Sequence, residues 1–326
     1  MAKGKVVFLA RTQSDERDVF LAAAPAELRV VIPTPNASQE EVNQEVQDAD
    51  FLVVYRHNFA LDEAIRKAKR LKLIQAMGQG TDRIPVRLAL ERGIPVANSG
   101  GANAVAVAEH TVLLMLASLR NLMFSVDALH RGKAGADMNS KDFHQLYAKT
   151  VGIVGFGNIG QLVAKLVCAF GANVIFSRRS DILQSTMVDL KARRVSLEEL
   201  LLSADVVTLH VPLTESTRGM IGWEQLAMMK PSAILINTSR GRVVDETALI
   251  RALMDKKIAG AGLDVFQQEP PRLDNPLLTM PNVIATPHIA GVAWENWELR
   301  VKNIWDNLLR VWQGKPPQNV VSAEGV

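Results

Sequence analysis

Cysteine is almost missing from this chain of 326 residues: Cys168 is its one cysteine, which excludes an intrachain disulfide. Long apolar runs are missing as well, since no stretch approaches the roughly 18 apolar residues that a membrane span needs. The apolar run at residues 6–10 ends at Arg11 and is too short for a signal peptide. No internal repeat or low-complexity tract occurs. We therefore expect a cytoplasmic protein without a membrane partner.

Charge of either sign is not concentrated in any segment. The 37 lysine and arginine residues and the 34 aspartate and glutamate residues are scattered along the chain, and the formal net charge is +3. Because no basic cluster exists, a nucleic-acid partner is not expected. Hydrophobic residues make up 48% of the chain and charged residues 22%, so the chain can build two sizeable cores.

Short apolar segments alternate with polar or amphipathic stretches along the chain. Strands are predicted near residues 5–10, 29–32, 51–55 and 73–76, and a second series near residues 150–154, 174–176, 206–210, 233–237, 258–263 and 283–285. Strands that alternate with helices form parallel sheets with helices on both faces, so two α/β units are expected. The capping box from Ser196 to Glu199 predicts a helix start between two of these strands. Cys168 is expected to pack in a core.

Three glycines follow the strand that begins at residue 150. Gly155 suits a tight turn, Gly157 lets the backbone approach a pyrophosphate, and Gly160 lets the next helix pack close to the strand. The N-terminus of that helix would then face the phosphates of a dinucleotide. The alternative is a glycine-rich turn without a ligand. The loop residues expected to contact the cofactor are Gly155, Phe156, Gly157, Asn158 and Ile159.

The end of the next strand predicts which cofactor is preferred. An acidic residue at this point accepts hydrogen bonds from the ribose hydroxyls of NAD, but this chain has Ser177, Arg178 and Arg179 there. A 2′-phosphate would meet two guanidinium groups and a hydroxyl, with no carboxylate to repel it. We therefore expect NADP(H) to be preferred, with NAD(H) possible. The alternative is that one or both arginines point into solvent.

Three segments in the second half of the chain supply a cation, a carboxylate and an imidazole, each just past a predicted strand. Arg240 can bind the carboxylate of a 2-keto acid and polarise its carbonyl, because its guanidinium is always charged and donates parallel hydrogen bonds. His288 can transfer a proton, and Glu269 beside it would favour the imidazolium. Ligands bind at the carboxyl ends of parallel strands, so the three residues predict catalysis. Taken singly, the arginine would be a surface ion pair and the histidine part of a turn.

These segments and four others resemble the D-isomer-specific 2-hydroxyacid dehydrogenases over nearly the whole chain. The four others are residues 78–82, 93–98, 103–109 and 209–214. The resemblance implies two Rossmann-like or flavodoxin-like, doubly wound α/β domains with parallel sheets and a cleft between them. The dinucleotide-binding domain is expected at residues 101–289. The substrate or catalytic domain is expected to be discontinuous, at residues 1–100 and 290–326. Helices are expected over 103–120 and 294–313, where the chain passes from one domain to the other.

The resemblance also implies further site residues. Gly78, Gln79 and Gly80 would bind the substrate carboxylate through backbone N–H groups, together with Arg240 and His288. No metal is expected. Further cofactor contacts are implied for His210, Val211, Pro212, Thr217, Thr238, Ser239, Asp264 and Gly291.

Four implied roles have structural alternatives. Asp264 would accept from the nicotinamide carboxamide or serve the fold. Arg56 and His57 would reach toward the substrate or lie in a solvated loop. The tryptophans of the last helix would form a packing stripe rather than bind a ligand. Trp294 and Met77 would narrow the substrate pocket. Alternatively, Trp294 would turn away and pack beneath that helix.

The sequence thus predicts an oxidoreductase, an NADPH-preferring reductase of small 2-keto acids to D-2-hydroxy acids. Glyoxylate and hydroxypyruvate are the expected substrates. One alternative is a phosphite- or formate-type dehydrogenase, but formate oxidation needs no proton donor such as the His–Glu pair. The other alternative is a co-repressor-like, nucleotide-sensing binding protein. The apolar segment at residues 105–119 corresponds to the helix that packs across a two-fold axis in the family, so a homodimer is expected.

Overall fold

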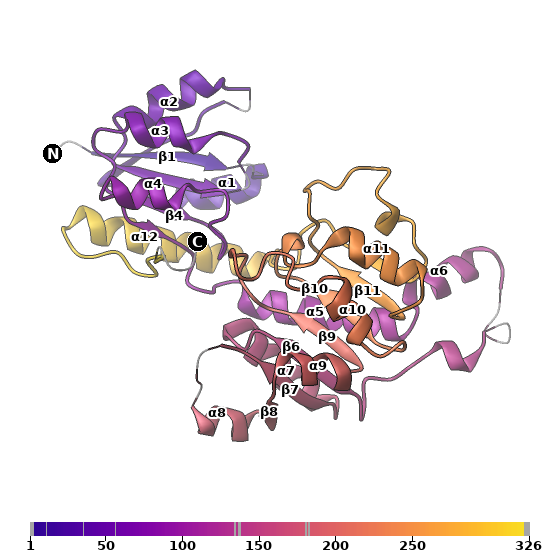
Figure 1. The fold of residues 1–326 in the computed structure, drawn as a ribbon. Coiled ribbons are helices and arrows are strands. Elements are labelled where there is room, and N and C mark those ends of the chain that lie inside the picture. The colour runs from indigo at the N-terminus through magenta and orange to yellow at the C-terminus, as the bar shows by residue number, and fades with distance from the viewer. Residues whose placement is uncertain are drawn as a thin grey trace. The chain divides into compact units, whose positions relative to one another are not determined.

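The computed structural model describes residues 3–10, 12–34, 36–55, 57–133, 135, 138–179, 181 and 183–322. Arg56, one of the residues singled out above, lies outside this part of the chain. The chain forms two compact units (Figure 1), Met1–Asn103 with Val292–Val326, and Ala104–Gly291. Each unit is a parallel sheet covered by helices on both faces, which confirms the predicted fold class.

The first unit is a five-stranded parallel sheet with the strand order β2-β1-β3-β4-β5. Its strands are β1 (Gly4–Ala10), β2 (Leu28–Val31), β3 (Phe51–Tyr55), β4 (Leu73–Ala76) and β5 (Val96–Ala97). Its helices are α1 (Ser14–Ala22), α2 (Gln39–Gln47), α3 (Leu61–Lys67), α4 (Val86–Glu91) and α12 (Trp294–Trp312). Helices α2, α3 and α4 pack on one face of the sheet, and α1 and α12 pack on the other.

Trp297 and Trp305 of α12 complete the core of the first unit. Trp297 donates its indole N–H to the Glu16 carbonyl oxygen at 2.9 Å, and Trp305 donates to the Phe20 carbonyl oxygen at 3.0 Å. Both rings are buried, as a packing stripe requires. Met77 belongs to the same core and has no exposed surface. The expectation that Met77 narrows a substrate pocket is therefore wrong, because a side chain without exposed surface cannot line one.

The second unit is a seven-stranded parallel sheet with the strand order β12-β11-β10-β9-β6-β7-β8. Its strands are β6 (Thr150–Val154), β7 (Asn173–Ser177), β8 (Ala192–Arg194), β9 (Val206–Leu209), β10 (Ile234–Asn237), β11 (Gly260–Leu263) and β12 (Val283–Ala285). Its α-helices are α5 (Ala104–Leu119), α6 (Leu122–His130), α7 (Asn158–Ala169), α8 (Gln184–Asp189), α9 (Leu197–Ser203), α10 (Trp223–Met228) and α11 (Glu246–Met254). Short 3₁₀ turns are η2 (Ser140–Asp142), η3 (Gly241–Val243) and η4 (Pro276–Leu278).

Two layers of apolar side chains sandwich this second sheet. Helices α5 and α7 cover one face, and α9, α10 and α11 cover the other. Cys168, near the end of α7, is partly buried against the apolar layer that α5 and α7 cover, as expected from the sequence. The carboxyl ends of all seven strands therefore lie along one edge, where the connecting loops are free to carry functional side chains.

Among the described helices, no single one has the length and apolar character required to cross a bilayer. Helices α5 and α6, which meet at a bend of 58°, meet that requirement only when taken together, by length and composition alone.

Candidate active site

The glycine loop joins β6 to α7. Gly155 has a φ of +92°, which residues with a side chain rarely adopt, and a Cβ atom there would lie 2.4 Å from the His210 carbonyl oxygen and 2.8 Å from Val211 Cγ1. A Cβ atom on Gly160 would lie 2.3 Å from the Gly155 carbonyl oxygen. Steric contact therefore requires glycine at both positions. A Cβ atom on Gly157 would meet nothing within 4 Å, so the backbone there borders open space.

Helix α7 begins directly after this loop, at Asn158. Its N-cap residue is Gly157, which has no side chain to accept hydrogen bonds from the N–H groups of the first turn. Such N–H groups carry partial positive charge and bind phosphate oxygens. The uncapped helix start and the open space at Gly157 therefore fit the pyrophosphate of a dinucleotide.

The segment that follows β9 borders the glycine loop. Burial lowers the pKa of His210 to about 3, so its imidazole is neutral, and its Nε2 atom lies 3.0 Å from Thr208 Oγ1. The Thr217 hydroxyl donates to the Pro212 carbonyl oxygen at 2.6 Å and accepts from the Thr214 N–H group at 2.8 Å. Thr217 thus fixes the turn, and its hydroxyl is engaged within the protein.

Ser177 ends β7, and both arginines that follow it contact neighbouring loops. Arg178 donates from Nη1 to the Phe156 carbonyl oxygen in the glycine loop at 3.0 Å. Arg179 donates from Nη1 to Ser216 Oγ, in the turn after β9, at 3.0 Å. The two guanidinium groups therefore lie beside the segments that surround the uncapped start of α7.

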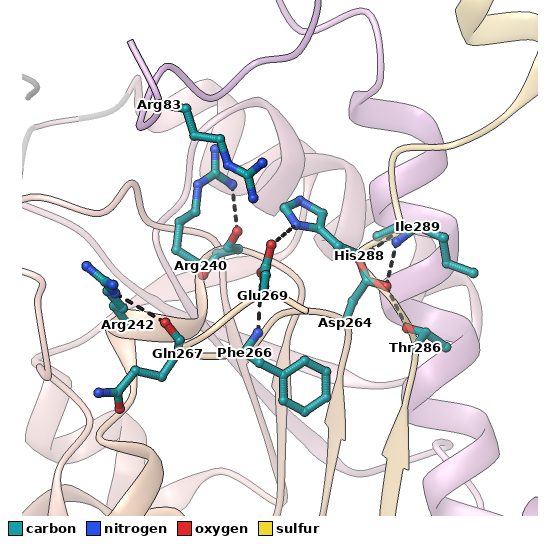
Figure 2. A network of polar contacts seen from close by, with 12 residues as sticks. Arg83, Arg240, Arg242, Asp264, Phe266, Gln267, Glu269, Thr286, His288 and Ile289 are labelled. Carbon is teal, nitrogen blue, oxygen red and sulfur yellow. Dashed lines mark hydrogen bonds and ion pairs between the residues drawn. The ribbon is translucent and has the colours of Figure 1, made fainter. Parts of the chain in front are cut away.

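Arg240 follows β10, on a loop that packs against the loop after β11 (Figure 2). A Cβ atom on Gly241 would lie 1.9 Å from the Phe266 carbonyl carbon, so the two backbones meet where only glycine fits. The Asn237 side chain holds the arginine loop, because its Oδ1 accepts from the Ser239 N–H group at 3.0 Å and its Nδ2 donates to the Arg240 carbonyl oxygen at 3.0 Å. Arg240 Nη1 donates to the Ser239 carbonyl oxygen at 2.6 Å.

Asp264 follows β11 and has no exposed surface. Its carboxylate accepts from Thr286 Oγ1 at 2.6 Å and from the N–H groups of Ile289 and Ala290 at 2.9 and 2.8 Å. Its carbonyl oxygen accepts from the His288 N–H group at 2.8 Å. These contacts support a structural role for Asp264, because they hold the segment that carries His288 in place. Acceptance from a nicotinamide carboxamide stays a prediction.

Glu269 and His288 form an ion pair at this edge (Figure 2). Glu269 Oε2 lies 2.7 Å from His288 Nδ1, and Glu269 Oε1 accepts from the Phe266 N–H group at 3.4 Å. The His288 backbone has a φ of +55°, a left-handed conformation uncommon for a residue with a side chain, and its hydrogen bond to Asp264 helps to hold it there. Because the carboxylate engages Nδ1, a proton transfer to a substrate would have to use Nε2.

Helix α5 supports two of these loops by contacts that sequence reasoning missed. Thr111 Oγ1 lies 2.8 Å from Thr238 Oγ1, and His110 Nε2 lies 3.0 Å from Thr286 Oγ1. The partners are 127 and 176 residues apart in the chain, so no short-range pattern signals them. These two contacts stabilise the loop that carries Arg240 and the loop that carries His288.

The residues expected to bind the substrate carboxylate lie in the first unit, after β4. The Ser99 N–H group donates to the Gly78 carbonyl oxygen at 3.1 Å, and Asn98 Nδ2 donates to the Gln79 carbonyl oxygen at 3.1 Å. Gly80 follows in the same loop. These contacts engage the loop's carbonyl groups and hold its backbone in place.

The remaining predicted residues have mixed environments. His57, after β3, is 5% exposed, and burial lowers the pKa of its imidazole, so it is not in a solvated loop. Trp294 begins α12 and is 50% exposed. Gly291 is the last residue of the second unit. Within the described part of the chain, no group of three His, Cys, Asp or Glu side chains could hold a metal ion.

Comparison with known proteins identifies the second unit. A family model described as "D-isomer specific 2-hydroxyacid dehydrogenase, NAD binding domain" matches residues 112–290, which is more than half of the chain. The match includes the glycine loop, both arginines after β7, and the segments with Arg240, Glu269 and His288.

Two curated relatives cover most of the chain. D-3-phosphoglycerate dehydrogenase of Methanocaldococcus jannaschii is 41% identical over 294 residues, which are 89% of this chain and 55% of that protein. This chain therefore spans about half the length of that relative. Glyoxylate reductase of Korarchaeum cryptofilum is 37% identical over 316 residues, which are 95% of this chain and 91% of that protein.

A solved structure has the same fold. An acyclic imino acid reductase in complex with NADPH and D-Arg superimposes with a TM-score of 0.85 at 27% identity, and the match covers 98% of this chain and 100% of that one.

Proposed function

Since this chain belongs to the family of D-isomer-specific 2-hydroxyacid dehydrogenases, we propose that it is an NADPH-preferring reductase that converts small 2-keto acids to D-2-hydroxy acids. One observation carries the proposal: the Glu269–His288 ion pair lies at the strand edge that also holds Arg240 and the glycine loop. The name of the glyoxylate reductase of Korarchaeum cryptofilum supports the substrate class.

His288 is the proposed proton donor. The Glu269 carboxylate, 2.7 Å from Nδ1, orients the ring and stabilises the imidazolium. The reduced nicotinamide, when bound, supplies the hydride that adds to the carbonyl carbon. His288 Nε2 then protonates the carbonyl oxygen, so that a hydroxyl group forms and the imidazole is left neutral. In the reverse direction the neutral imidazole takes the hydroxyl proton as a base.

Arg240 is the proposed group that orients the substrate. Its guanidinium would bind the carboxylate of the keto acid and polarise the carbonyl, which stabilises the negative charge that develops on the oxygen. The Asn237 and Ser239 contacts fix the loop from which the side chain projects. Gly78, Gln79 and Gly80, in the first unit, are proposed to contribute backbone N–H groups to substrate binding.

The cofactor preference is proposed from Arg178 and Arg179. Both side chains lie by the loops that border the start of α7, and the strand end contains no carboxylate to accept the ribose hydroxyls of NAD. A 2′-phosphate would receive charge-assisted hydrogen bonds from both guanidinium groups. NADH is expected to bind more weakly, since it has no phosphate to use them.

A homodimer is the proposed assembly. Helices α5 and α6 expose large apolar side chains that a single copy leaves in water: Val105, Leu113, Met123, Phe124 and Leu129. A second copy of the same surface, related by a two-fold axis, would bury them.

The proposed function is tested by assays with a panel of keto acids and with formate and phosphite. Consumption of NADPH should be measured with glyoxylate, hydroxypyruvate, pyruvate and phenylpyruvate, and reduction of NADP⁺ with formate and phosphite. We expect the highest kcat/KM with glyoxylate or hydroxypyruvate, with the half-exposed Trp294 limiting larger substituents. A preference for phenylpyruvate would contradict the small pocket. Turnover of formate or phosphite alone would support the rival dehydrogenase, and cofactor binding without any turnover would support a binding protein.

A further inference from the structure

One arginine that no motif identified braces the segment after β7. Arg194 is the last residue of β8, the edge strand, and pairs in register with Phe176 of β7. Its Nη2 atom donates to the carbonyl oxygens of Arg178 at 3.0 Å and Arg179 at 3.3 Å. Its Nη1 atom lies 2.8 Å from Asp181 Oδ1. A single guanidinium group thus bridges three residues of this segment.

We propose that Arg194 is a positioning residue that determines cofactor selectivity, by holding the backbone from which Arg178 and Arg179 reach a 2′-phosphate. This inference rests on the proposed preference for NADPH. A planar guanidinium donates in several fixed directions at once, so it restrains both peptide groups together. Restraint before binding reduces the entropy that the two arginine side chains and their backbone lose when they contact the phosphate.

The contacts of Arg194 favour positioning over direct attraction. Its positive charge is paired with Asp181, so its net field at a nearby phosphate is small. The arginine next to it on β8 offers a matched comparison. Arg193 Nη1 lies 2.7 Å from Glu199 Oε1, and within the described chain Arg193 makes no hydrogen bond to the segment after β7. Replacing Arg193 removes the same charge from the same strand and leaves the two carbonyl contacts intact.

The experiment compares the full-length protein with Arg194→Ala, Arg194→Lys and Arg193→Ala. Dissociation constants for NADPH and NADH are measured by calorimetry, and kcat and KM are measured with both cofactors. We expect Arg194→Ala to bind NADPH about tenfold more weakly, as when a charge-assisted hydrogen bond is weakened, with an unchanged Kd for NADH. In the assay, KM for NADPH should rise while kcat at saturating cofactor stays constant. Arg194→Lys should resemble Arg194→Ala, because a single ammonium cannot span both carbonyl groups and the carboxylate.

Several outcomes would overturn the inference. If Arg194→Lys retains the full preference for NADPH, charge rather than bracing is responsible. If Arg193→Ala loses as much affinity for NADPH as Arg194→Ala, or if Arg194→Ala weakens NADH equally, the effect is a general one on charge or folding. If the unmodified protein prefers NADPH and Arg194→Ala does not change the ratio, the bracing role fails while the proposed function stands. If the unmodified protein does not prefer NADPH, the cofactor part of the proposed function fails, and this inference fails with it.

Discussion

His288 Nδ1 and Glu269 Oε2 lie 2.7 Å apart although 19 residues separate them. Each residue follows a different strand, β11 for the glutamate and β12 for the histidine, and these strands are parallel neighbours. Neighbouring parallel strands end at the same edge of a sheet, so the topology alone brings the two side chains together. The roles proposed for His288 and Glu269 can be tested by separate substitutions.

The first prediction removes the proton donor. His288→Gln keeps a similar size and some hydrogen bonding, but the amide cannot transfer a proton. We expect the rate of keto acid reduction to fall roughly 10²–10⁴-fold, as for the loss of a general acid. The Kd for NADPH, measured by fluorescence titration, should stay within about twofold and serves as the control. Near-normal turnover would show that another group donates the proton.

The second prediction removes the negative charge beside the imidazole. In Glu269→Gln a neutral amide replaces the carboxylate beside the His288 ring and no longer stabilises an imidazolium, so the alkaline limb of the reduction profile should move to lower pH. The pKa of His210, lowered to about 3 by burial, keeps that imidazole neutral across the assay range, so His210 does not contribute to this limb. Rates of reduction measured from about pH 5 to pH 9 give the comparison, and an unchanged profile would remove Glu269 from this role.

The third prediction concerns the backbone contact between two catalytic loops. Gly241→Ala would place a methyl group 1.9 Å from the Phe266 carbonyl carbon, so the loops with Arg240 and Glu269 must move apart. We expect kcat/KM to fall by more than about tenfold, because misplaced groups lose their orientation to the substrate. Gly222→Ala is the matched control, since its methyl group would meet its nearest atoms at 3.5 and 3.6 Å. Equal activity of the two variants would contradict a role for the contact.

The fourth prediction concerns the cofactor. If Arg178 and Arg179 each contribute roughly 1.5 kcal/mol to binding the 2′-phosphate, NADPH should be preferred on the order of 100-fold. Arg178→Asp replaces one of these cations with a carboxylate that repels the phosphate and accepts from ribose hydroxyls. The ratio of kcat/KM for NADPH to that for NADH should therefore drop sharply. Equal use of both cofactors by the unmodified protein would refute the assignment.

The fifth prediction concerns assembly. Light scattering at micromolar concentration should give twice the chain mass of 35.7 kDa. Leu113→Glu places a charge on the exposed apolar surface of α5 and should yield the monomer mass. Leu273→Glu is the control, because Leu273 is 96% exposed but lies outside α5 and α6. A monomer for the unmodified protein, or the same mass for both variants, would count against this interface.

Much of the fold was accessible from the sequence because most of its strands are apolar segments that alternate with polar or amphipathic stretches. The strands β3, β4, β6 and β12 have the predicted ends, and the remaining predicted strands differ by one or two residues. Strands β5 and β8 were missed. The first has two residues, and the second is Ala192-Arg193-Arg194, whose charged residues lie at a sheet edge and give no apolar signal.

The site shows where sequence reasoning reaches its limit. Arg240, Glu269 and His288 could be predicted as site residues because each follows a strand and has a chemically distinctive side chain, and the structure brings Glu269 and His288 into contact. The bracing role of Arg194 depends on hydrogen bonds to backbone carbonyl oxygens, which no residue pattern encodes. Met77, which follows β4 directly, was wrongly predicted to narrow the pocket, because its side chain packs in the core of the first unit.

The division of the chain places most of the proposed site residues in one unit. Arg240, Glu269 and His288 all lie between Ala104 and Gly291, together with the glycine loop and both arginines after β7, whereas Gly78, Gln79 and Gly80 belong to the first unit. The proposed proton donor, the proposed substrate-binding arginine and the proposed cofactor loop therefore belong to one continuous stretch of the chain. Exchange of the loops after β3 and β4 for those of a relative should redirect the enzyme to another keto acid and leave its redox machinery untouched. The first unit is the natural target for redesign of substrate range.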